Sequence, residues 1–357
     1  MASPPDQATR PGHKLPILST AVTMNSSTTM KYRCLVAEKD PAGNTVATIA
    51  ERNLGTASEN QVTIRVAYSS LNYKDALAAT GHPGVARKLP LVPGIDAAGS
   101  VTASNSDRFQ VGDEVLVFAP PFGTELDGGF SEFVIVPDSW VYKLPTGLNL
   151  LEAMSIGTGG FTAAQCVDEL LRHRITPSHG EIVVTGATGG VGIYAVKLLA
   201  RLGYKVVASS GKPHLVEWLK QHGATEVIGR SDLDDRTQRP LLSARWGGAV
   251  DTVGGNTLAT ILRGTKPYGC VTACGLVGGA DLNMTVYPFI LRGVTLQGVD
   301  TAGISREYRS DIWQRLATSW RLPDLDKLSY IVSLDGLTEE IARILRGEIA
   351  GRVVVKL

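Results

Sequence analysis

The sequence predicts an α/β fold combined with a β-rich domain. Short strand-like segments separated by Gly, Asn and Pro fill the chain from Lys31 to about residue 140, with little helix between them. From about Leu151 onward, strands alternate with amphipathic helices, which is typical of a parallel sheet with crossover helices. That second region contains a glycine-rich turn between a buried strand and an apolar helix. At roughly 150 residues per domain, the 357 residues fit two domains.

The composition excludes several classes of protein. Hydrophobic residues make up 43% of the chain and charged residues 19%, so it can bury a sizeable core. The 35 Lys and Arg balance 34 Asp and Glu without a long block of one sign, which excludes a broad surface for nucleic acid. No apolar run reaches the roughly 18 residues of a membrane span, and the first thirty positions lack the continuous apolar region that a secretory signal would have. We therefore expect no nucleic-acid or membrane partner.

The first expected element is a mobile N-terminal arm over residues 1–30. This stretch contains Pro, Ser and Thr without a sustained hydrophobic period. Arg10 and Lys14 give it a faint resemblance to a mitochondrial transit peptide, which Asp6 and the prolines weaken. We expect a cytoplasmic protein, with a mitochondrial location as the alternative.

The β-rich region that follows predicts a partly open β-barrel covered by a few helices, because its strands are closely spaced and its turns irregular. The expected strands are 32–38, 45–51, 61–72, 99–104, 113–120 and 130–137. In the second region, the expected helices and strands alternate through 161–173, 181–186, 191–203, 205–210 and 214–223. Further strands are expected at 249–254, 269–275 and 294–300, then helices at 308–320 and 337–347. The final strand, 352–357, can return to the first domain.

The glycine-rich turn is the strongest local signal for a ligand. In EIVVTGATGGVGIYAV, residues 181–196, a buried strand runs into an A-x-G-x-x-G turn and an apolar helix. Ala187 stands where the dinucleotide fingerprint has its first glycine. Gly189 lets the backbone approach a pyrophosphate, and Gly192 permits close packing of the helix on the strand. The free N–H groups at the helix start favour a phosphate charge.

The choice of dinucleotide is predicted at the end of the next strand. An NAD site needs an acidic residue there for the ribose 2′-hydroxyl, and KVVASSGKPH contains none. Ser209, Ser210, the Gly211 amide and Lys212 instead form a donor-rich, cationic cradle suited to a 2′-phosphate. The sequence therefore favours NADPH. Alternatively, Lys212 is a solvated residue at the head of the next helix, which still does not favour NAD.

With these features in place, the chain resembles a zinc-independent medium-chain dehydrogenase/reductase. Its motifs are similar to those of the acryloyl-CoA reductase subgroup, often labelled quinone oxidoreductase-like. They are SSLNYKDALAATG (69–81), PGIDAAGSV (93–101), IGTGGFTAAQCV (156–167), VVTGATGGVG (183–192), DTVGG (251–255), ACGLVGG (273–279) and PFILRGVTLQGVD (288–300). The resemblance implies a GroES-like domain formed by both chain ends, with a Rossmann-fold domain inserted between them. The implied domains are 31–155 with 299–357, and 156–298.

The resemblance also implies a reaction and an assembly. It implies hydride transfer from NADPH to the β-carbon of an α,β-unsaturated carbonyl or acyl thioester of the acryloyl-CoA type, in a homodimer. The nearest alternative is an NADPH:quinone reductase, and no residue of the sequence decides between them. A third reading is an NADPH-binding protein without turnover.

A metal site is not expected. The zinc-dependent branch of the same family has its ligands where this chain reads LNYKD and PGIDAAG. The four cysteines, Cys34, Cys166, Cys270 and Cys274, form neither a disulfide framework nor spaced zinc-binding pairs. Zinc-free chemistry requires another group to stabilise negative charge on the carbonyl oxygen.

Asn72 and Tyr73 are the predicted catalytic residues, because the segment that holds them faces the domain cleft in similar proteins. Tyr73 would donate to the developing enolate or stack near the nicotinamide; alternatively, it is a packing tyrosine whose hydroxyl bonds the backbone. Asn72 either orients the carbonyl or caps a helix. Asp96 is expected to order its loop by hydrogen bonds. The remaining cofactor contacts implied by the resemblance are Thr188, Gly189, Gly190, Val191, Arg230, Leu276, Ile290 and Thr301, together with Tyr73 and the cradle at 209–212.

Overall fold

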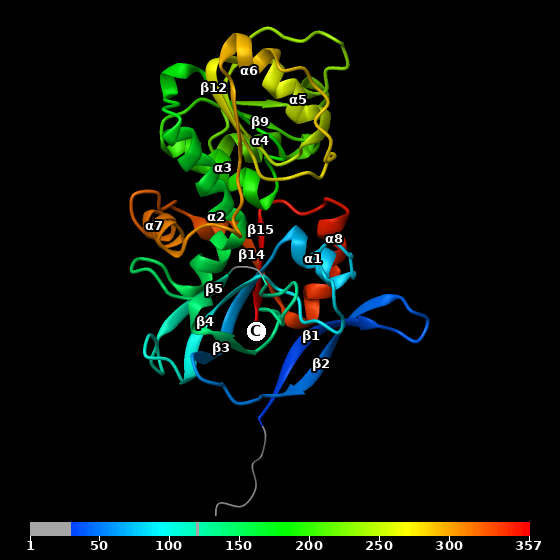
Figure 1. Cartoon of the computed structure of the whole chain (residues 1–357), viewed down its shortest axis with the longest axis vertical. Helices are drawn as coiled ribbons and strands as arrows, with labels where there is room; N and C mark the ends of the chain where they lie inside the picture. Colours follow the sequence, from blue (N-terminus) through cyan, green and yellow to red (C-terminus); the bar gives the residue numbers. More distant parts are fainter. Residues whose placement is uncertain (1–29, 119–120) are drawn as a thin grey trace, which may run out of the picture.

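This computed structural model describes residues 30–118 and 121–357. The arm expected over residues 1–30 lies, apart from Met30, outside the described residues. Figure 1 shows two lobes, one above the other, with helix α2 (Leu150–Arg172) running between them. No helix in the described ranges is long and apolar enough to cross a membrane.

The lower lobe is built on a mixed sheet that joins both ends of the described chain. Its strand order is β14-β15-β3-β4-β5-β7, and β6 pairs with β3. The C-terminal strand β15 runs antiparallel to β3, with Val353 opposite Leu71, as expected for a final strand that returns to the first domain. The strands are β3 (Gln61–Leu71), β4 (Asp96–Ser104), β5 (Glu114–Phe118), β6 (Phe133–Pro137), β7 (Val141–Lys143), β14 (Ser329–Ser333) and β15 (Arg352–Lys356).

A hairpin and three helices complete this lobe. Strands β1 (Lys31–Lys39) and β2 (Thr45–Asn53) pair antiparallel beside the sheet. Helix α1 (Tyr73–Ala79) follows β3 directly and packs close to α8 (Leu337–Leu345). Helix α7 (Arg306–Ala317) packs against α2. The β-rich domain predicted from the strand pattern is thereby confirmed.

The upper lobe is a six-stranded parallel sheet with the order β10-β9-β8-β11-β12-β13. From β8 the chain adds β9 and β10 on one side of the sheet, and from β11 it adds β12 and β13 on the other. The direction in which strands are added therefore reverses between β8 and β11. Open α/β sheets bind ligands at such a position. The strands are β8 (Glu181–Val184), β9 (Val206–Ser209), β10 (Glu226–Ile228), β11 (Trp246–Asp251), β12 (Thr265–Ala273) and β13 (Thr295–Gly298). The helices are α3 (Gly190–Arg201), α4 (Val216–Gln221), α5 (Gly255–Arg263) and α6 (Tyr287–Arg292). The Rossmann-type sheet is confirmed.

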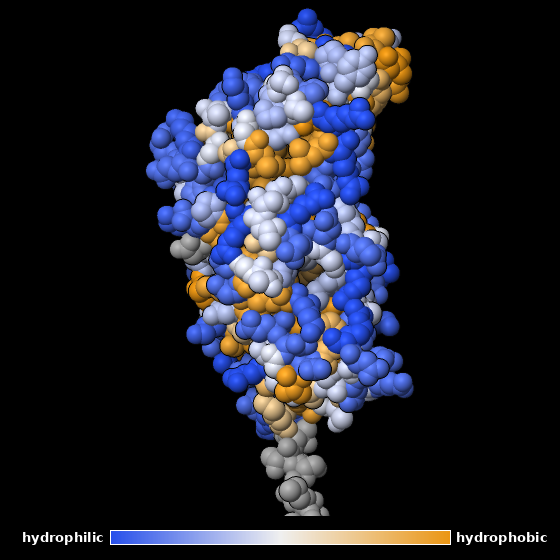
Figure 2. All heavy atoms as spheres, turned by 90° about the vertical axis from the view of Figure 1, so that its left-hand side faces the viewer, coloured by the Kyte–Doolittle hydropathy of each residue, from blue (hydrophilic) through white to orange (hydrophobic). Residues whose placement is uncertain are grey.

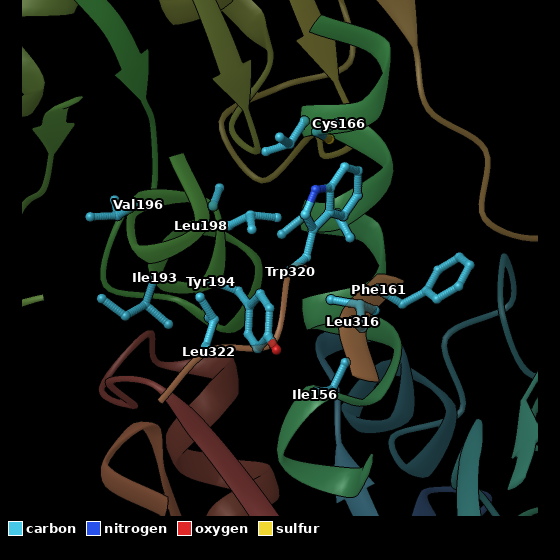
Figure 3. Packing of buried hydrophobic residues seen from close by; sticks show 14 of the residues in the cluster. Ile156, Phe161, Cys166, Ile193, Tyr194, Val196, Leu198, Leu316, Trp320 and Leu322 are labelled. Carbon is cyan, nitrogen blue, oxygen red and sulfur yellow. The ribbon is translucent and has the colours of Figure 1, made fainter. Parts of the chain in front are cut away.

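Helix α2 connects the two lobes through a continuous apolar core. Figure 3 shows Ile156 and Phe161 of α2 in the same buried cluster as Tyr194 of α3. A Cβ at Gly160 would lie 2.8 Å from the Tyr194 ring, so glycine there lets α3 approach α2 closely. The helix kinks at Gly157, where φ is 47° and ψ is −164°. The implied boundary between residues 155 and 156 therefore falls just before this kink, and the domain boundaries stay a prediction.

Candidate active site

The glycine-rich turn follows β8 and leads into α3. Gly186 has φ of +56°, and the Gly189 N–H donates to its carbonyl at 2.9 Å, so Gly186 makes the sharp turn that Ala187 cannot make. A Cβ at Gly192 would lie 2.3 Å from the Gly186 carbonyl oxygen. The close packing of helix on strand that the sequence assigns to Gly192 is therefore present.

The start of α3 leaves room for a pyrophosphate. Gly189 caps the helix, and the N–H groups of Gly190 and Val191 belong to its first turn, where no intrahelical acceptor exists. A Cβ at Gly189 would meet only the Gly186 carbonyl, at 3.3 Å, whereas one at Gly190 would lie 2.9 Å from Arg352 Cδ. The arrangement fits the phosphate-binding role that the sequence predicts for this turn.

The expected cradle for a 2′-phosphate lies at the end of β9. The Ser210 hydroxyl accepts from the Lys212 N–H at 3.0 Å. The Arg230 guanidinium lies over Gly211, where an added Cβ would be 2.4 Å from Arg230 Nε, so the structure brings Arg230 to the cradle. Burial, and then the charge of Arg230, lower the pKa of Lys212. Ser209 is 4% exposed, so its side chain lies inside the lobe rather than in the open cradle.

Four predicted cofactor contacts remain: Leu276, Ile290, Thr301 and, within the glycine-rich turn, Thr188. Leu276 and Ile290 are 66% and 67% exposed on the β12–α6 loop and on α6. The Thr301 hydroxyl hydrogen-bonds the Thr162 hydroxyl at 2.9 Å, which ties residue 301 to α2. Thr188 is buried, and its carbonyl accepts from the Gly351 N–H at 2.9 Å. Their roles toward a cofactor stay predictions.

Tyr73 is the first residue of α1 and is 43% exposed. Among the described residues, none accepts a hydrogen bond from its hydroxyl or donates one to it. This geometry disagrees with the alternative of a packing tyrosine whose hydroxyl bonds the backbone. The hydroxyl is instead available to a ligand.

Asn72 precedes it and is only 8% exposed. Its Nδ2 donates to Asp96 Oδ2 at 2.8 Å, to Asp75 Oδ2 at 3.0 Å and, more weakly, to the Ser70 carbonyl at 3.3 Å. Its Oδ1 accepts from Arg352 Nη1 at 3.0 Å. Because an amide has two hydrogens to donate, this side chain is fully engaged inside the protein. Asn72 therefore fixes the entry to α1, and the geometry favours positioning over direct contact with a carbonyl.

Asp96 is the centre of these contacts and is fully buried. It accepts from the Ser70 hydroxyl at 2.5 Å, from the Thr158 N–H at 2.9 Å and from the Thr158 hydroxyl at 2.6 Å. Arg352 Nη2 donates to the Ser70 hydroxyl at 2.9 Å and lies 3.8 Å from Asp96 Oδ2. Asp96 does order its loop, as expected, but it also ties β3, α2 and β15 together. The buried cluster, as we call it below, comprises Ser70, Asn72, Asp75, Asp96, Thr158 and Arg352.

Four members of the buried cluster were not predicted from the sequence: Ser70, Thr158, Arg352 and Asp75. Arg352 was treated only as the start of a strand, although a charged residue heading the apolar run RVVV was a signal for a buried partner. Asp75 is the third residue of α1, where a carboxylate commonly accepts from the N–H groups at the helix start. It does accept from the Asn72 N–H at 2.8 Å, but it also accepts from the Ile95 N–H at 2.8 Å and is fully buried.

The buried cluster perturbs its own titration. Burial, and then the charge of Asp96, raise the pKa of Asp75 to about 7, against hydrogen bonds from Asn72 and Ile95 that lower it. Burial lowers the pKa of Arg352, and the negative charge of Asp96 opposes that shift. A carboxyl group that titrates near neutral pH therefore accepts a hydrogen bond from Asn72, the residue before Tyr73.

This shift predicts a pH dependence of stability. The pKa of Asp75 rises from its ordinary 3.8 to about 7 on folding. The folded state therefore binds a proton more tightly, and stability from this group is present below about pH 4 and lost as the pH rises to about 7. We expect the free energy of unfolding of the wild type, measured relative to Asp75→Asn in urea, to fall across that window. A difference between the two proteins that is the same at pH 4.5 and pH 7.5 would contradict the assignment.

The segments LNYKD and PGIDAAG, which stand where the zinc-dependent branch has its ligands, contribute Asn72, Asp75 and Asp96 to the buried cluster. Within 30–118 and 121–357, no three His, Cys, Asp or Glu side chains are grouped so that they could hold a metal ion. We predict that the purified protein contains no stoichiometric zinc and keeps its activity in a chelator, as metal analysis and an assay with EDTA would measure. Activity that is lost with the chelator and restored by zinc would overturn this prediction.

Two family models match the chain. One, described as a zinc-binding dehydrogenase, matches residues 190–318, and one described as an alcohol dehydrogenase GroES-like domain matches residues 58–146. The first covers most of the parallel-sheet lobe. The second covers strands β3 to β7, including Asn72, Tyr73 and Asp96.

Relatives match over nearly the whole chain. A Bacillus subtilis protein named putative quinone oxidoreductase YhfP is 44% identical over 330 residues, which cover 91% of this chain and 99% of its own. The acrylyl-CoA reductase AcuI of Ruegeria pomeroyi is 41% identical over 325 residues, covering 91% and 98%. A probable acrylyl-CoA reductase AcuI of Escherichia coli is 44% identical over 315 residues, covering 88% and 97%.

Solved structures agree with this likeness. The yhdH oxidoreductase of Salmonella enterica, in complex with NADP, has a TM-score of 0.87 at 42% identity and covers 91% of this chain and 99% of its own. Bacillus subtilis yhfP, with NAD bound, has a TM-score of 0.88 at 42% identity and covers 92% and 100%. The chain therefore belongs to the medium-chain dehydrogenase/reductase family of oxidoreductases, alongside the YhfP and AcuI proteins.

Proposed function

We propose that this protein reduces the carbon–carbon double bond of an α,β-unsaturated carbonyl or acyl thioester with NADPH. The observation that carries the proposal is the hydroxyl of the half-exposed Tyr73, which has no hydrogen-bond partner among the described residues. Tyr73 directly follows Asn72 of the buried cluster, which holds the start of α1 in place. The cluster in turn contacts the glycine-rich turn, because Arg352 packs against Gly190. A hydrogen-bond donor and a dinucleotide site thus meet at the junction of the lobes. The AcuI relatives, named acrylyl-CoA reductases, support the same chemistry.

The residues of the upper lobe fit NADPH. The open turn at Gly189 suits the pyrophosphate, and the cradle of Ser210, Lys212 and Arg230 suits a 2′-phosphate. When bound there, NADPH supplies a hydride, which is delivered to the β-carbon of the substrate. The Salmonella relative with NADP supports this choice, whereas the Bacillus relative was solved with NAD.

Tyr73 is the group placed to stabilise the charge that develops on the carbonyl oxygen. The Tyr73 hydroxyl can donate a hydrogen bond to that oxygen, since it has no hydrogen-bond partner among the described residues. Asn72 positions Tyr73, because its side-chain amide is held by Asp75, Asp96 and Arg352. It is the residue directly before Tyr73, at which α1 begins. Solvent at the exposed face of Tyr73 provides the proton for the α-carbon.

A quinone reductase is the second candidate, favoured by the name of the Bacillus relative. The two candidates are separated by measuring the rate of NADPH oxidation with each of a panel of acceptors. The panel contains acryloyl-CoA, longer enoyl-CoAs and benzoquinones. We expect the enoyl thioesters to be reduced with the higher kcat/KM. Faster reduction of every quinone than of any enoyl thioester would favour the second candidate, and binding of NADPH without oxidation by any acceptor would indicate a protein without turnover.

Replacing Lys212 tests the cofactor. We expect Lys212→Ala to weaken NADPH by about 1.5 to 3 kcal/mol, as for loss of a hydrogen bond to a charged group, or roughly ten- to a hundredfold in affinity. NADH should be affected much less, because it lacks the 2′-phosphate. Titration of both cofactors by fluorescence or calorimetry measures the two constants. Equal weakening of NADPH and NADH would show that Lys212 does not contact the 2′-phosphate.

A homodimer is the assembly we propose. In the parallel sheet as described, β13 is an outer strand that pairs only with β12. Large exposed apolar residues come from β12 and from the segment that leads to β13: Tyr268, Leu276, Val277, Leu282, Val286, Tyr287, Ile290 and Leu291. Figure 2 shows an orange patch at the same upper end of the molecule that carries α6 in Figure 1. Such a patch at an unpaired edge favours association with a second copy. It also offers a second reading for Leu276 and Ile290, as interface residues rather than cofactor contacts.

A further inference from the structure

A short segment before β15 contacts three parts of the site at once. Residues 349–352, which we call the linker, follow α8, which ends at Leu345, and include Arg352, the first residue of β15. The Lys212 ammonium donates to the Ile349 carbonyl at 2.5 Å, and the Gly351 N–H donates to the Thr188 carbonyl at 2.9 Å. Arg352 donates to Asn72 Oδ1 at 3.0 Å. Within four residues, the linker therefore contacts the cationic cradle, the glycine-rich turn and the buried cluster.

The linker also packs against the helix that carries Tyr73. Ile349 is 8% exposed and belongs to the same apolar cluster as Leu71, Ala76 and Ala79. Ala76 and Ala79 lie on α1, of which Tyr73 is the first residue. A displacement of Ile349 would therefore move α1 through side-chain packing. This route does not depend on the hydrogen bond between Arg352 and Asn72.

The linker has little freedom to absorb a displacement. Gly351 has φ of +73°, and a Cβ there would lie 2.3 Å from the Leu328 carbonyl oxygen. The Arg352 guanidinium fills the space beside Gly159, where a Cβ would lie 2.8 Å from Nη1. Because such interiors are close-packed, a shift at one contact of the linker is transmitted to the others.

Lys212 has the chemistry to join a phosphate to this linker. An ammonium group has three hydrogens to donate, and one of them is directed at the Ile349 carbonyl. Burial and the charge of Arg230 lower the pKa of Lys212, whereas a phosphate beside it favours the charged form. The charged form makes the stronger hydrogen bond to the carbonyl. A phosphate in the cradle would thus tighten the contact between Lys212 and the linker.

We propose that a 2′-phosphate in the cradle strengthens the contact between Lys212 and the linker and so holds α1, Tyr73 and Asn72 in their reactive arrangement. The inference rests on the proposed use of NADPH. It makes Lys212 a positioning residue as well as a phosphate contact. The protein then discriminates NADPH from NADH in turnover and not in affinity alone.

The first test needs only cofactor binding. Hydrogen exchange of the Gly351 amide is measured with saturating NADPH and with saturating NADH, in the wild type, Lys212→Met and Lys220→Ala. Lys220 is a matched control, because it loses the same charge on the surface of α4, where it pairs with Glu217. We expect NADPH to protect this amide roughly fivefold or more over NADH in the wild type and in Lys220→Ala. In Lys212→Met the two cofactors should protect it equally. Equal protection in the wild type, or an unchanged difference in Lys212→Met, would overturn the proposal.

The second test measures turnover at saturating cofactor, with whichever acceptor the protein reduces. We expect the kcat ratio of NADPH to NADH to be well above one in the wild type and to fall close to one in Lys212→Met. Loss of correct positioning costs roughly ten- to a hundredfold in such cases. A kcat ratio that stays at the wild-type value while KM for NADPH rises would reduce Lys212 to a phosphate contact and overturn the proposal. If no acceptor is reduced, the proposed reaction fails, and the hydrogen-exchange test still decides on the linker.

Discussion

Tyr73→Phe is expected to slow alkene reduction by about a hundred- to a thousandfold while leaving the fold and NADPH binding intact. The substitution removes one hydroxyl and keeps the aromatic ring, so it isolates the hydrogen bond. A donor directed at charge developing on a carbonyl oxygen contributes roughly 2.7 to 4 kcal/mol to the transition state. Tyr73 is half-exposed and its hydroxyl has no partner among the described residues, so removal of the hydroxyl leaves no buried group of these residues unsatisfied. The loss should appear in kcat and kcat/KM alike, measured with an enoyl thioester under conditions where chemistry limits the rate.

The matched control is Tyr142→Phe. Tyr142 packs against Phe118, with a ring-centroid distance of 6.2 Å. It lies on the outer strand β7, which β4 and β5 separate from β3, the strand that leads into α1. Its hydroxyl should be dispensable for the reaction. A Tyr73→Phe variant that turns over at nearly the wild-type rate would exclude Tyr73 as the electrophile. The ribose hydroxyl of the cofactor would then be the better candidate, because the Asn72 amide is engaged inside the buried cluster.

Arg352→Met is expected to cost about 3 to 5 kcal/mol of unfolding free energy, as for removal of one partner from a buried ion pair. Arg352 is 3% exposed, donates to Asn72 and Ser70, and lies 3.8 Å from Asp96 Oδ2. Without it, the carboxylate of Asp96 stays buried with no opposite charge at that distance. Urea unfolding of the wild type and the variant at pH 7 measures the difference.

Two further variants make this prediction specific. Arg346 pairs with Glu348 at 2.6 Å but is 56% exposed, so Arg346→Met should change stability by less than about 1 kcal/mol. The double variant Arg352→Met with Asp96→Asn should recover part of the loss, because it also removes the uncompensated charge. A loss below about 1 kcal/mol for Arg352→Met alone would mean that the buried cluster does not depend on the ion pair.

Most of the fold could be predicted from local patterns. The alternation of strands and helices after residue 151 indicated the parallel sheet, because periodicity and turn residues report on each element separately. The glycine-rich turn was predicted for the same reason, since its strand, turn and helix are contiguous. One detail differs, because the sharp turn is made by Gly186, one residue before the position that the fingerprint assigns to Ala187.

The buried cluster could not be predicted in the same way. Asn72 and Arg352 are separated by 280 residues, and their contact depends on β15 pairing with β3, which no local pattern specifies. In the sequence, the position of Asp75 is typical of an acidic residue in the first turn of a helix. Its burial depends on the packing of the loop around Ile95, which only the structure shows. Ser209 and Ser210 are adjacent in the sequence, yet only Ser210 faces the cradle, because alternate residues of a strand end point to opposite sides.

The most direct test of the proposed reaction follows a labelled hydride. NADPH carrying deuterium at the transferable position of its nicotinamide is incubated with the protein and acryloyl-CoA in ordinary water, and the saturated thioester is analysed by mass spectrometry and NMR. We predict one deuterium on the β-carbon and a solvent proton on the α-carbon. Saturated product with deuterium on the α-carbon or without deuterium would contradict hydride transfer to the β-carbon. An unchanged thioester, while a quinone is reduced by the same preparation, would contradict the proposed function itself.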